Sequence, residues 1–296
     1  MPSRPPNFLF IGPDKAGSSW LYGALRTHPQ VCLSQVKELF FFDQFYDQGW
    51  RWYLKYFEHA GEEHRMVGEI CHDYLFSRLA CQRIARDLPA VKLMVCLREP
   101  AQRAFSEYLY MTKLGLLSCD FDTSLQKEKG LIEHGCYARH LANYLKYFSR
   151  EQIYVAIFDD LVADQQRFFD RLCDFLGLPH SALPPALKGT ILPASKPRLP
   201  YLARIGRRIA WSARRLGLPE VVARIKGCAP LNRILYQPYR SGEKPEISPA
   251  TRESLRRVFF PELRHLDALL GTNLCVRWGY AARAVPTHLE TVQSPQ

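Results

Sequence analysis

Apolar positions along the chain follow two alternating patterns. Short apolar runs are typical of strands covered in a sheet, and they occur at residues 7–12, 67–71, 91–97 and 153–158. Apolar residues recurring every three to four positions predict helices, which fall at residues 17–27, 101–113, 137–148 and 161–176. Because strands alternate with helices, the pattern predicts an α/β fold of three layers, with a central parallel sheet flanked by helices.

The pattern changes in the second half of the chain. Residues 179–200 hold six prolines and predict an irregular connection. Residues 201–216 are amphipathic and predict a helix that packs through an apolar stripe and exposes arginines. The stripe consists of Leu202, Ile205, Ile209, Ala213 and Leu216, and the arginines are Arg204, Arg207, Arg208, Arg214 and Arg215.

A last helix is bounded by clear signals at both ends. Ser248-Pro249 is a favourable N-cap and N1 pair, and the apolar pattern runs toward Leu270 before Gly271. The expected organisation is one domain over residues 1–281, with a basic, proline-rich helical insertion at about 180–245. Residues 282–296 are expected to form a disordered tail.

The positive charge is concentrated in one segment. The 296 residues include 40 Lys and Arg against 29 Asp and Glu, a formal charge of +11. Residues 188–244 alone carry 13 basic and two acidic residues, which equals the whole excess. This segment is compatible with a solvated arginine face, or with an acidic glycan or glycolipid at an anionic membrane surface. Nucleic-acid binding is disfavoured because no recognised module is present.

Membrane and secretory signals are weak. No apolar stretch approaches the roughly 18 residues that a membrane span needs, and the N-terminal apolar run is too short for a signal peptide. Nine cysteines without a CxxC pair favour a reduced protein. We therefore expect a cytoplasmic location.

The strongest local signal is a strand, loop and helix at residues 8–25, FLFIG-PDKAGSS-WLYGAL. Gly12 and Gly17 bracket a tight P-loop-like turn whose N–H groups and following helix favour an anion. In a nucleotide-hydrolysing Walker loop a lysine follows the second glycine, but here Ser18 does, and the loop's lysine is Lys15. An ATP hydrolase is disfavoured, although an ordinary turn with a stray lysine stays possible.

A second element strengthens the anion-binding interpretation. In LMVCLREPAQRAFSEYLY, a buried strand ends at Arg98, and Ser106 lies about two turns into the next helix. Because ligands of open α/β sheets bind at the carboxyl ends of the strands, Arg98 and Lys15 should face one crevice. Arginine can hold a phosphate through two hydrogen bonds. The alternative is that Arg98 pairs on the surface with Glu99 or Glu107.

These two motifs together resemble the sulfotransferases that use 3′-phosphoadenosine 5′-phosphosulfate (PAPS), especially the glycan-modifying branch and its bacterial relatives. The loop resembles the 5′-phosphosulfate motif, with binding positions Lys15, Ala16, Gly17, Ser18, Ser19 and Trp20. By the same resemblance Arg98 and Ser106 bind the 3′-phosphate. The segment VKELFFFDQFYDQGWRWYLKYF is similar to the acceptor side of the glycan branch and has Glu38 at the position of the catalytic base. The last helix also resembles that of the family.

The chain departs from the family's pattern at two places. Where the heparan-type enzymes carry Glu-Lys on a strand, this chain has Glu69-Ile70, and His72 could supply a polar group nearby. The family's basic-glycine-basic loop is loosely present as Arg240-Ser241-Gly242 with Lys244, which the resemblance adds to the cofactor-binding residues. Both departures concern the acceptor more than the cofactor.

The resemblance implies a bacterial PAPS-dependent O-sulfotransferase that needs no metal. Its acceptor would be a hydroxyl of a glycan, a lipid-linked sugar or a small natural product, with possible peripheral membrane contact through residues 201–216. Lys15, Glu38 and His72 would be the catalytic residues, Glu38 being the base and His72 sharing that role or binding acceptor. A P-loop-like kinase and a non-catalytic anion-binding protein remain as alternatives.

Overall fold

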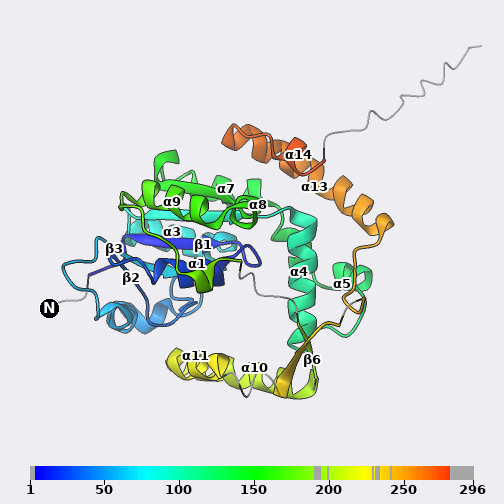
Figure 1. Cartoon of the computed structure of the whole chain (residues 1–296), viewed down its shortest axis with the longest axis horizontal. Helices are drawn as coiled ribbons and strands as arrows, with labels where there is room; N and C mark the ends of the chain where they lie inside the picture. Colours follow the sequence, from blue (N-terminus) through cyan, green and yellow to red (C-terminus); the bar gives the residue numbers. More distant parts are fainter. Residues whose placement is uncertain are drawn as a thin grey trace, which may run out of the picture.

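A computed structural model describes residues 4–280 except 190–194, 199, 229, 231–233 and 241. Its centre is a five-stranded sheet in the order β2-β3-β1-β4-β5, in which every pairing is parallel (Figure 1). The strands are β1 Phe8–Gly12, β2 Val31–Leu33, β3 Met66–Ile70, β4 Lys92–Leu97 and β5 Ile153–Ile157. The predicted parallel sheet is confirmed, and β2 is the strand that the apolar pattern did not predict because it is only three residues long.

Helices connect and cover these strands. The helices are α1 Ser18–Leu25, α2 Gly49–Leu54, α3 Arg78–Asp87, α4 Pro100–Lys113, α5 Phe121–Lys127, α6 Gly130–Glu133, α7 Tyr137–Tyr144, α8 Phe158–Ala163, α9 Gln165–Leu176, α10 Pro200–Arg215, α11 Pro219–Gly227, α13 Pro249–Leu270 and α14 Leu274–Arg277. Short 3₁₀ helices occupy Tyr46–Gln48, Lys55–Phe57, Tyr74–Phe76, Arg150–Gln152 and Pro185–Leu187.

The single helix predicted over residues 161–176 is wrong, because the chain forms two helices there. Asp164 adopts an extended conformation between α8 and α9 and ends the first helix. Its side chain accepts a hydrogen bond from the N–H of Arg167 at 3.0 Å, so it caps the second helix. Gly177 closes α9 in the left-handed conformation, as the sequence predicted.

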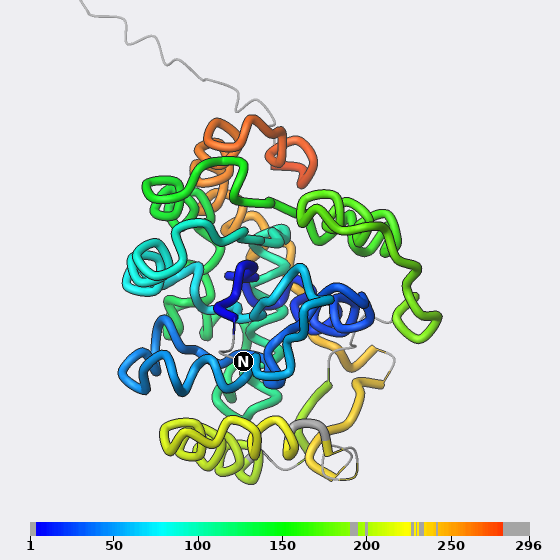
Figure 2. The backbone as a smooth tube through the Cα atoms, turned by 90° about the vertical axis from the view of Figure 1, so that its left-hand side faces the viewer, coloured from blue at the N-terminus to red at the C-terminus, as the bar shows by residue number. Residues whose placement is uncertain are grey.

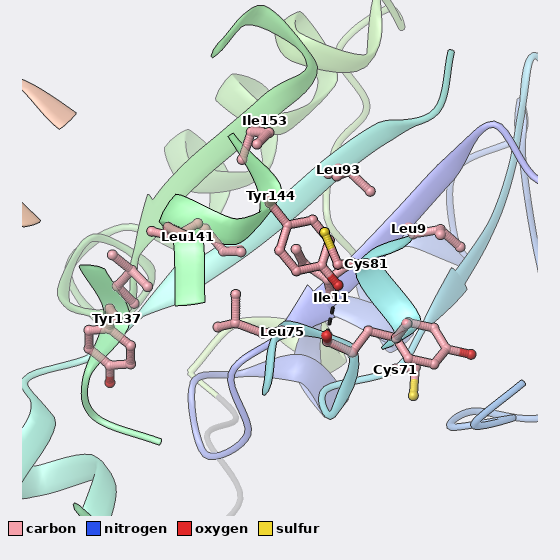
Figure 3. Close-up of a cluster of buried hydrophobic side chains, with 14 of the residues drawn as sticks. Leu9, Ile11, Cys71, Leu75, Cys81, Leu93, Tyr137, Leu141, Tyr144 and Ile153 are labelled. Atoms are coloured by element: carbon pink, nitrogen blue, oxygen red, sulfur yellow. Dashed lines mark hydrogen bonds between the residues drawn. The ribbon is translucent and has the colours of Figure 1, made fainter. Parts of the chain in front are cut away.

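The sheet has a hydrophobic core on each face. Phe8 and Phe10 of β1 belong to a buried cluster with residues of α1 and α9. Leu9 and Ile11 alternate to the other face and pack in a cluster with residues of α3 and α7. Figure 3 shows this second face, where Tyr144 of α7 lies among the strand residues. The predicted three-layer architecture is confirmed.

The basic segment leaves and rejoins the domain through a small antiparallel sheet. Its strands, β6 Ser195–Pro197 and β7 Tyr236–Pro238, pair with each other, and β6 packs against α4. Between them the chain forms α10 and α11, which lie side by side at one edge of the molecule (Figures 1 and 2).

The predicted orientation of α10 is wrong. Leu202, Ile209 and Leu216 of the expected packing stripe are exposed, whereas Ala203 and Arg214 are buried. The helix therefore packs through a face that includes arginine, because its position is set by contacts with the rest of the domain. Trp211 of this face lies against Phe40 and Phe45.

The last helix has the predicted bounds. Ser248 caps α13 by accepting a hydrogen bond from the N–H of Thr251 at 3.0 Å, and Gly271 ends it with φ 65°. The helix packs against α7. Among the described helices, none combines the length and apolar character needed to cross a membrane. The predicted disordered tail, 282–296, and Ser241 of the predicted basic loop lie outside the described residues.

Candidate active site

The loop between β1 and α1 has the geometry of an anion-binding turn. Gly17 has φ 88° at the N-cap of α1, and a Cβ there would lie 2.6 Å from a methyl carbon of Leu161. The first backbone hydrogen bond of the helix runs from the N–H of Leu21 to Gly17 O, at 2.9 Å. The preceding N–H groups, those of Ser18, Ser19 and Trp20, therefore point out of the helix N-terminus, where they favour a negative charge.

Arg98 lies against this loop, as the sequence predicted. Its Nη1 donates a hydrogen bond to Lys15 O at 3.0 Å, and its guanidinium lies 4.8 Å from the ring centre of Phe158. The Arg98 Nε atom is buried and has no hydrogen-bond partner in the protein. An unpaired buried donor is costly, so this nitrogen fits a site that an anionic ligand completes.

A buried ion pair fixes the loop to α4, and the sequence analysis missed it. Arg103 is fully buried and donates to Asp14 Oδ1 at 3.1 Å and to Leu131 O at 2.6 Å. Burial raises the pKa of Asp14, but Arg103 and a hydrogen bond with Glu107 together outweigh burial and hold the pKa well below its usual range. Burial and the neighbouring Asp14 raise the pKa of Glu107 well above its usual range.

Lys15 enters the site from the same loop with φ 59°. Its Nζ lies 4.0 Å from the centre of the Tyr110 ring on α4. Burial lowers the pKa of Lys15, while the carboxyl groups of Glu107 and Asp14 oppose that shift. The loop lysine is thus partly desolvated, which strengthens its interaction with an anion.

The segment that follows β2 brings Glu38 to the mouth of the loop. Lys37 Nζ donates to Glu38 Oε1 at 2.9 Å, to Ser18 Oγ at 3.1 Å and to Ser19 Oγ at 3.2 Å. The Glu38 N–H donates to Ile70 O at 3.0 Å, which fixes the segment to the end of β3. Sequence reasoning did not place Lys37 in the site and considered it only as a surface ion-pair partner of Glu38, the alternative to a catalytic role for that carboxylate.

His72 contacts the same carboxylate. Its Nδ1 lies 3.3 Å from Glu38 Oε1, and its Nε2 lies 3.2 Å from Asp73 Oδ1. Burial lowers the pKa of His72, but the two carboxylates outweigh burial and raise the pKa above 6.5. Two neighbouring carboxylates favour the protonated form of an imidazole, and in that form the ring cannot act as a base.

Arg214 of α10 completes the surroundings of Glu38. Its Nη1 donates to Glu38 O, its Nη2 lies 3.9 Å from Glu38 Oε2, and its guanidinium lies 4.9 Å from the Phe40 ring centre. The side chain is 6% exposed. Nothing in the sequence distinguishes Arg214 from the other arginines of this helix, because the choice depends on which face packs.

The remaining predicted residues lie in different surroundings. Ser106 is half-buried on α4, and Ala16 is buried in the core beside the loop. The indole of Trp20 packs against Phe168 and donates to Leu187 O at 3.0 Å, so only its backbone faces the anion site.

Arg240 and Lys244 were also predicted to bind the cofactor. Arg240 and Lys244 are exposed beyond β7, and their role in cofactor binding stays a prediction. In the described part of the chain no group of three or more His, Cys, Asp or Glu is placed to hold a metal ion.

Comparison with known proteins gives a consistent result. The family model described as "Sulfotransferase domain" matches residues 5–196. The membrane-associated sulfotransferase kil1 of Dictyostelium discoideum is 32% identical over 43% of this chain and 29% of its own length. The human heparan sulfate glucosamine 3-O-sulfotransferase 3B1 is 31% identical over 58% of this chain and 46% of its own length. The chain therefore matches less than half the length of each of these relatives.

Solved structures share the fold. A sulfotransferase from Alicyclobacillus acidocaldarius aligns with TM-score 0.68 and 24% identity over 93% of this chain and 99% of the other. The mouse sulfotransferase SULT7A1 complexed with PAP aligns with TM-score 0.52 and 13% identity over 95% of this chain and 91% of the other. Because the family model spans more than half of the 296 residues, the chain belongs to the sulfotransferase family.

Proposed function

We propose that the protein transfers the sulfuryl group of PAPS to a hydroxyl of an acceptor, a carbohydrate or a glycosylated small molecule. The observation that carries the proposal is the position of Lys37, which bonds to Glu38 and to both loop serines. Through Lys37 the Glu38 carboxylate lies beside the loop. Transfer to a hydroxyl needs a base in such a position, because the hydroxyl must lose its proton. Family membership supports a sulfotransferase over a kinase.

The loop side would bind the donor and stabilise the leaving group. Lys15, together with the N–H groups of Ser18 and Ser19, neutralises charge on the leaving 5′-phosphate oxygen. Arg98 and Ser106 hold the 3′-phosphate, and the unpaired Arg98 Nε supports this role. Lys37 donates to the oxygens of the moving sulfuryl group, because it lies between the loop and the base.

The acceptor side would prepare the nucleophile. The Glu38 carboxylate takes the proton of the acceptor hydroxyl as the new O–S bond forms. The bond from sulfur to the phosphate oxygen breaks, and its electron pair goes to that oxygen. Protonated His72, with Arg214, keeps Glu38 ionised and oriented, so His72 positions the base and does not replace it.

The acceptor class rests on weaker support. The relatives named as heparan sulfate sulfotransferases support a sugar hydroxyl. The proposed compartment is the cytoplasm, a choice supported by nine cysteines that are all free.

Donor specificity can be tested by calorimetry. The protein should bind 3′,5′-ADP, which keeps the 3′-phosphate, more tightly than ATP. An Arg98→Gln variant should lose most of this preference, since the arginine is assigned to that phosphate. Equal binding of ATP and 3′,5′-ADP would contradict the proposal and favour a kinase.

The transfer step is tested through Glu38. Turnover of PAPS is measured with a panel of sugar and small-molecule acceptors, and products are identified by mass spectrometry. Glu38→Gln should keep affinity for 3′,5′-ADP and lose transfer by about 10²–10⁴-fold, the contribution typical of a general base. Glu58→Gln, an exposed glutamate outside the site, is the matched control. Unchanged transfer in Glu38→Gln would remove the base from the mechanism.

A further inference from the structure

The exposed apolar side chains of the protein gather on α10 and α11. Tyr201 of α10 is 72% exposed, and Leu216, directly after the last residue of that helix, is 76% exposed. The remaining large apolar residues exposed there and in the turn between the helices are Leu202, Ile209, Leu218, Val221 and Ile225. Exposed apolar residues gathered in one part of the surface mark an interaction site more often than singly scattered ones do.

The apolar stripe cannot be covered by a rotation of α10. The opposite face of the helix is fixed to the domain by Arg214 on Glu38 and by Ala203, which is 2% exposed. Arg204 also donates from its Nε to Gly115 O at 2.8 Å, behind the end of α4. The stripe therefore stays on the outside of the folded domain.

Arginines flank the stripe on one side. A groove of about 430 Å³ is lined by Arg204, Arg208, Trp211 and Arg215 among others, next to the apolar stripe on the helix surface. On a helical projection Arg208 and Arg215 are the groove arginines nearest the stripe, so their long side chains can extend along the edge of an apolar layer. An apolar stripe bordered by arginine is the arrangement of a helix that lies in a membrane interface.

We propose that the α10–α11 face docks on an anionic lipid bilayer. The stripe lies at the boundary of the acyl chains, and the arginine groove binds the headgroup phosphates. Charge complementarity favours an anionic bilayer as the partner, because residues 188–244 carry 13 basic and two acidic residues. A second copy of the chain would bring two such surfaces together, and like charges would oppose that contact. The docking is independent of the transfer reaction proposed above.

Docking has a geometric consequence for the site. Arg214, which contacts Glu38, and the exposed stripe lie on opposite faces of α10, so a docked protein would have this one helix between the bilayer and Glu38. The sugar of a lipid-linked acceptor would then have to extend past α10, one helix diameter of roughly 10 Å, to reach Glu38. This consequence rests on the proposed function, whereas the vesicle experiment below does not.

Vesicle flotation of the full chain tests the docking. The protein should bind vesicles of phosphatidylcholine mixed with phosphatidylglycerol and bind phosphatidylcholine vesicles at least about tenfold less. Added salt should weaken the binding. Ile209→Glu with Leu216→Glu should reduce it by about tenfold or more, and Arg208→Gln with Arg215→Gln should reduce the preference for the anionic lipid.

Matched controls separate docking from folding. Leu79→Glu and Val258→Glu change apolar residues that are 49% and 44% exposed on other helices, and they should bind vesicles as the unchanged protein does. All variants should keep affinity for 3′,5′-ADP, which reports a folded domain. Equal binding to both vesicle types, or binding that survives Ile209→Glu with Leu216→Glu, overturns the proposal. A concentration-dependent dimer in light scattering that Ile209→Glu abolishes also overturns it, because a second copy is then the occupant.

Discussion

At the scale of single residues, backbone strain is concentrated at the candidate active site. Lys15, Glu38 and Phe40 have φ of 59°, 64° and 54°, and they are the non-glycine residues with positive φ in the described part of the chain. Such a conformation costs of the order of 1–3 kcal/mol and persists only where surrounding contacts enforce it. Here the bond from the Glu38 N–H to Ile70 O and the contact of Phe40 with Trp211 do so. Two of these three residues, Lys15 and Glu38, are among the predicted catalytic residues.

Lys37 should contribute directly to turnover. In Lys37→Met the loop serines and Glu38 lose their shared donor, so we expect kcat to fall by about 10²–10³-fold. Lys55→Met removes a lysine that is 38% exposed in a surface ion pair, and it should leave kcat unchanged. Steady-state kinetics of both variants check this. A kcat for Lys37→Met close to that of the unchanged enzyme would remove the lysine from the transfer step.

His72 should set the alkaline side of the pH profile. Glu38 and Asp73 raise its pKa above the usual 6.5, so the imidazolium that holds Glu38 persists to higher pH than a free imidazolium does and is lost as pH rises past that pKa. We expect kcat to fall as pH rises past the pKa of His72. In His72→Asn this fall should disappear, and kcat should be lower than that of the unchanged enzyme at all pH values. If His72 were instead the base, kcat would rise as pH increases past the pKa of His72. The substitution would then remove this rise on the acid side of the pH profile.

At the scale of elements, α4 organises one face of the site. Arg103, Glu107 and Tyr110 lie three or four positions apart and so share a face of this helix, on which they meet Asp14 and Lys15. The carboxyl end of β4 delivers Arg98 to the same place. A single helix thus fixes the loop between β1 and α1 through charge, and this coupling was not visible in the linear spacing of the residues.

Arg103→Met should destabilise the fold. The substitution leaves Asp14 buried without its cation, which typically costs about 3–5 kcal/mol. Combining it with Asp14→Asn should recover part of that loss, since the buried charge is then removed as well. Arg139→Met, at an arginine that is 56% exposed and paired with Glu262, is the control and should change stability by less than about 0.5 kcal/mol. Urea unfolding gives the free energy of unfolding of each variant. If the losses of Arg103→Met and Asp14→Asn simply added in the double variant, the two side chains would not interact as a pair.

Elements whose ends are clearly signalled by neighbouring residues were predicted correctly, whereas features that depend on distant contacts were not. The bounds of α13 were correct because Ser248 and Gly271 signal the ends locally. The break at Asp164 was missed because the apolar pattern continues through it, although an aspartate before a helical run was an available cap signal. The packing face of α10 was wrong since it depends on Phe40 and Glu38, about 170 residues away in sequence, as the contact of Arg214 with Glu38 illustrates.

At the scale of the whole molecule, one buried carboxyl joins the sheet to the acceptor segment. Glu69 of β3 accepts from Tyr53 Oη at 2.7 Å, Tyr74 Oη at 3.1 Å and the Leu39 N–H at 3.1 Å. Sequence analysis identified Glu69 as a feature retained from the family's pattern. Its three partners come from separate segments, so the network itself follows only from the folded structure.

Glu69 should make stability depend on pH. Burial outweighs the three hydrogen bonds and raises the pKa of Glu69 from 4.5 to about 7. Between these values the folded state keeps a proton that the unfolded state releases, so the free energy of unfolding falls as pH rises, by up to about 3 kcal/mol.

Urea unfolding at pH values near the two ends of that window measures this effect. Glu69→Gln removes the titration, so its stability should change less between the two pH values than that of the unchanged protein. Asp43, whose pKa is also raised to about 7, leaves a remaining slope in both proteins. Comparing the two slopes therefore isolates Glu69, and identical slopes would show that its carboxyl titrates alike in the folded and unfolded states.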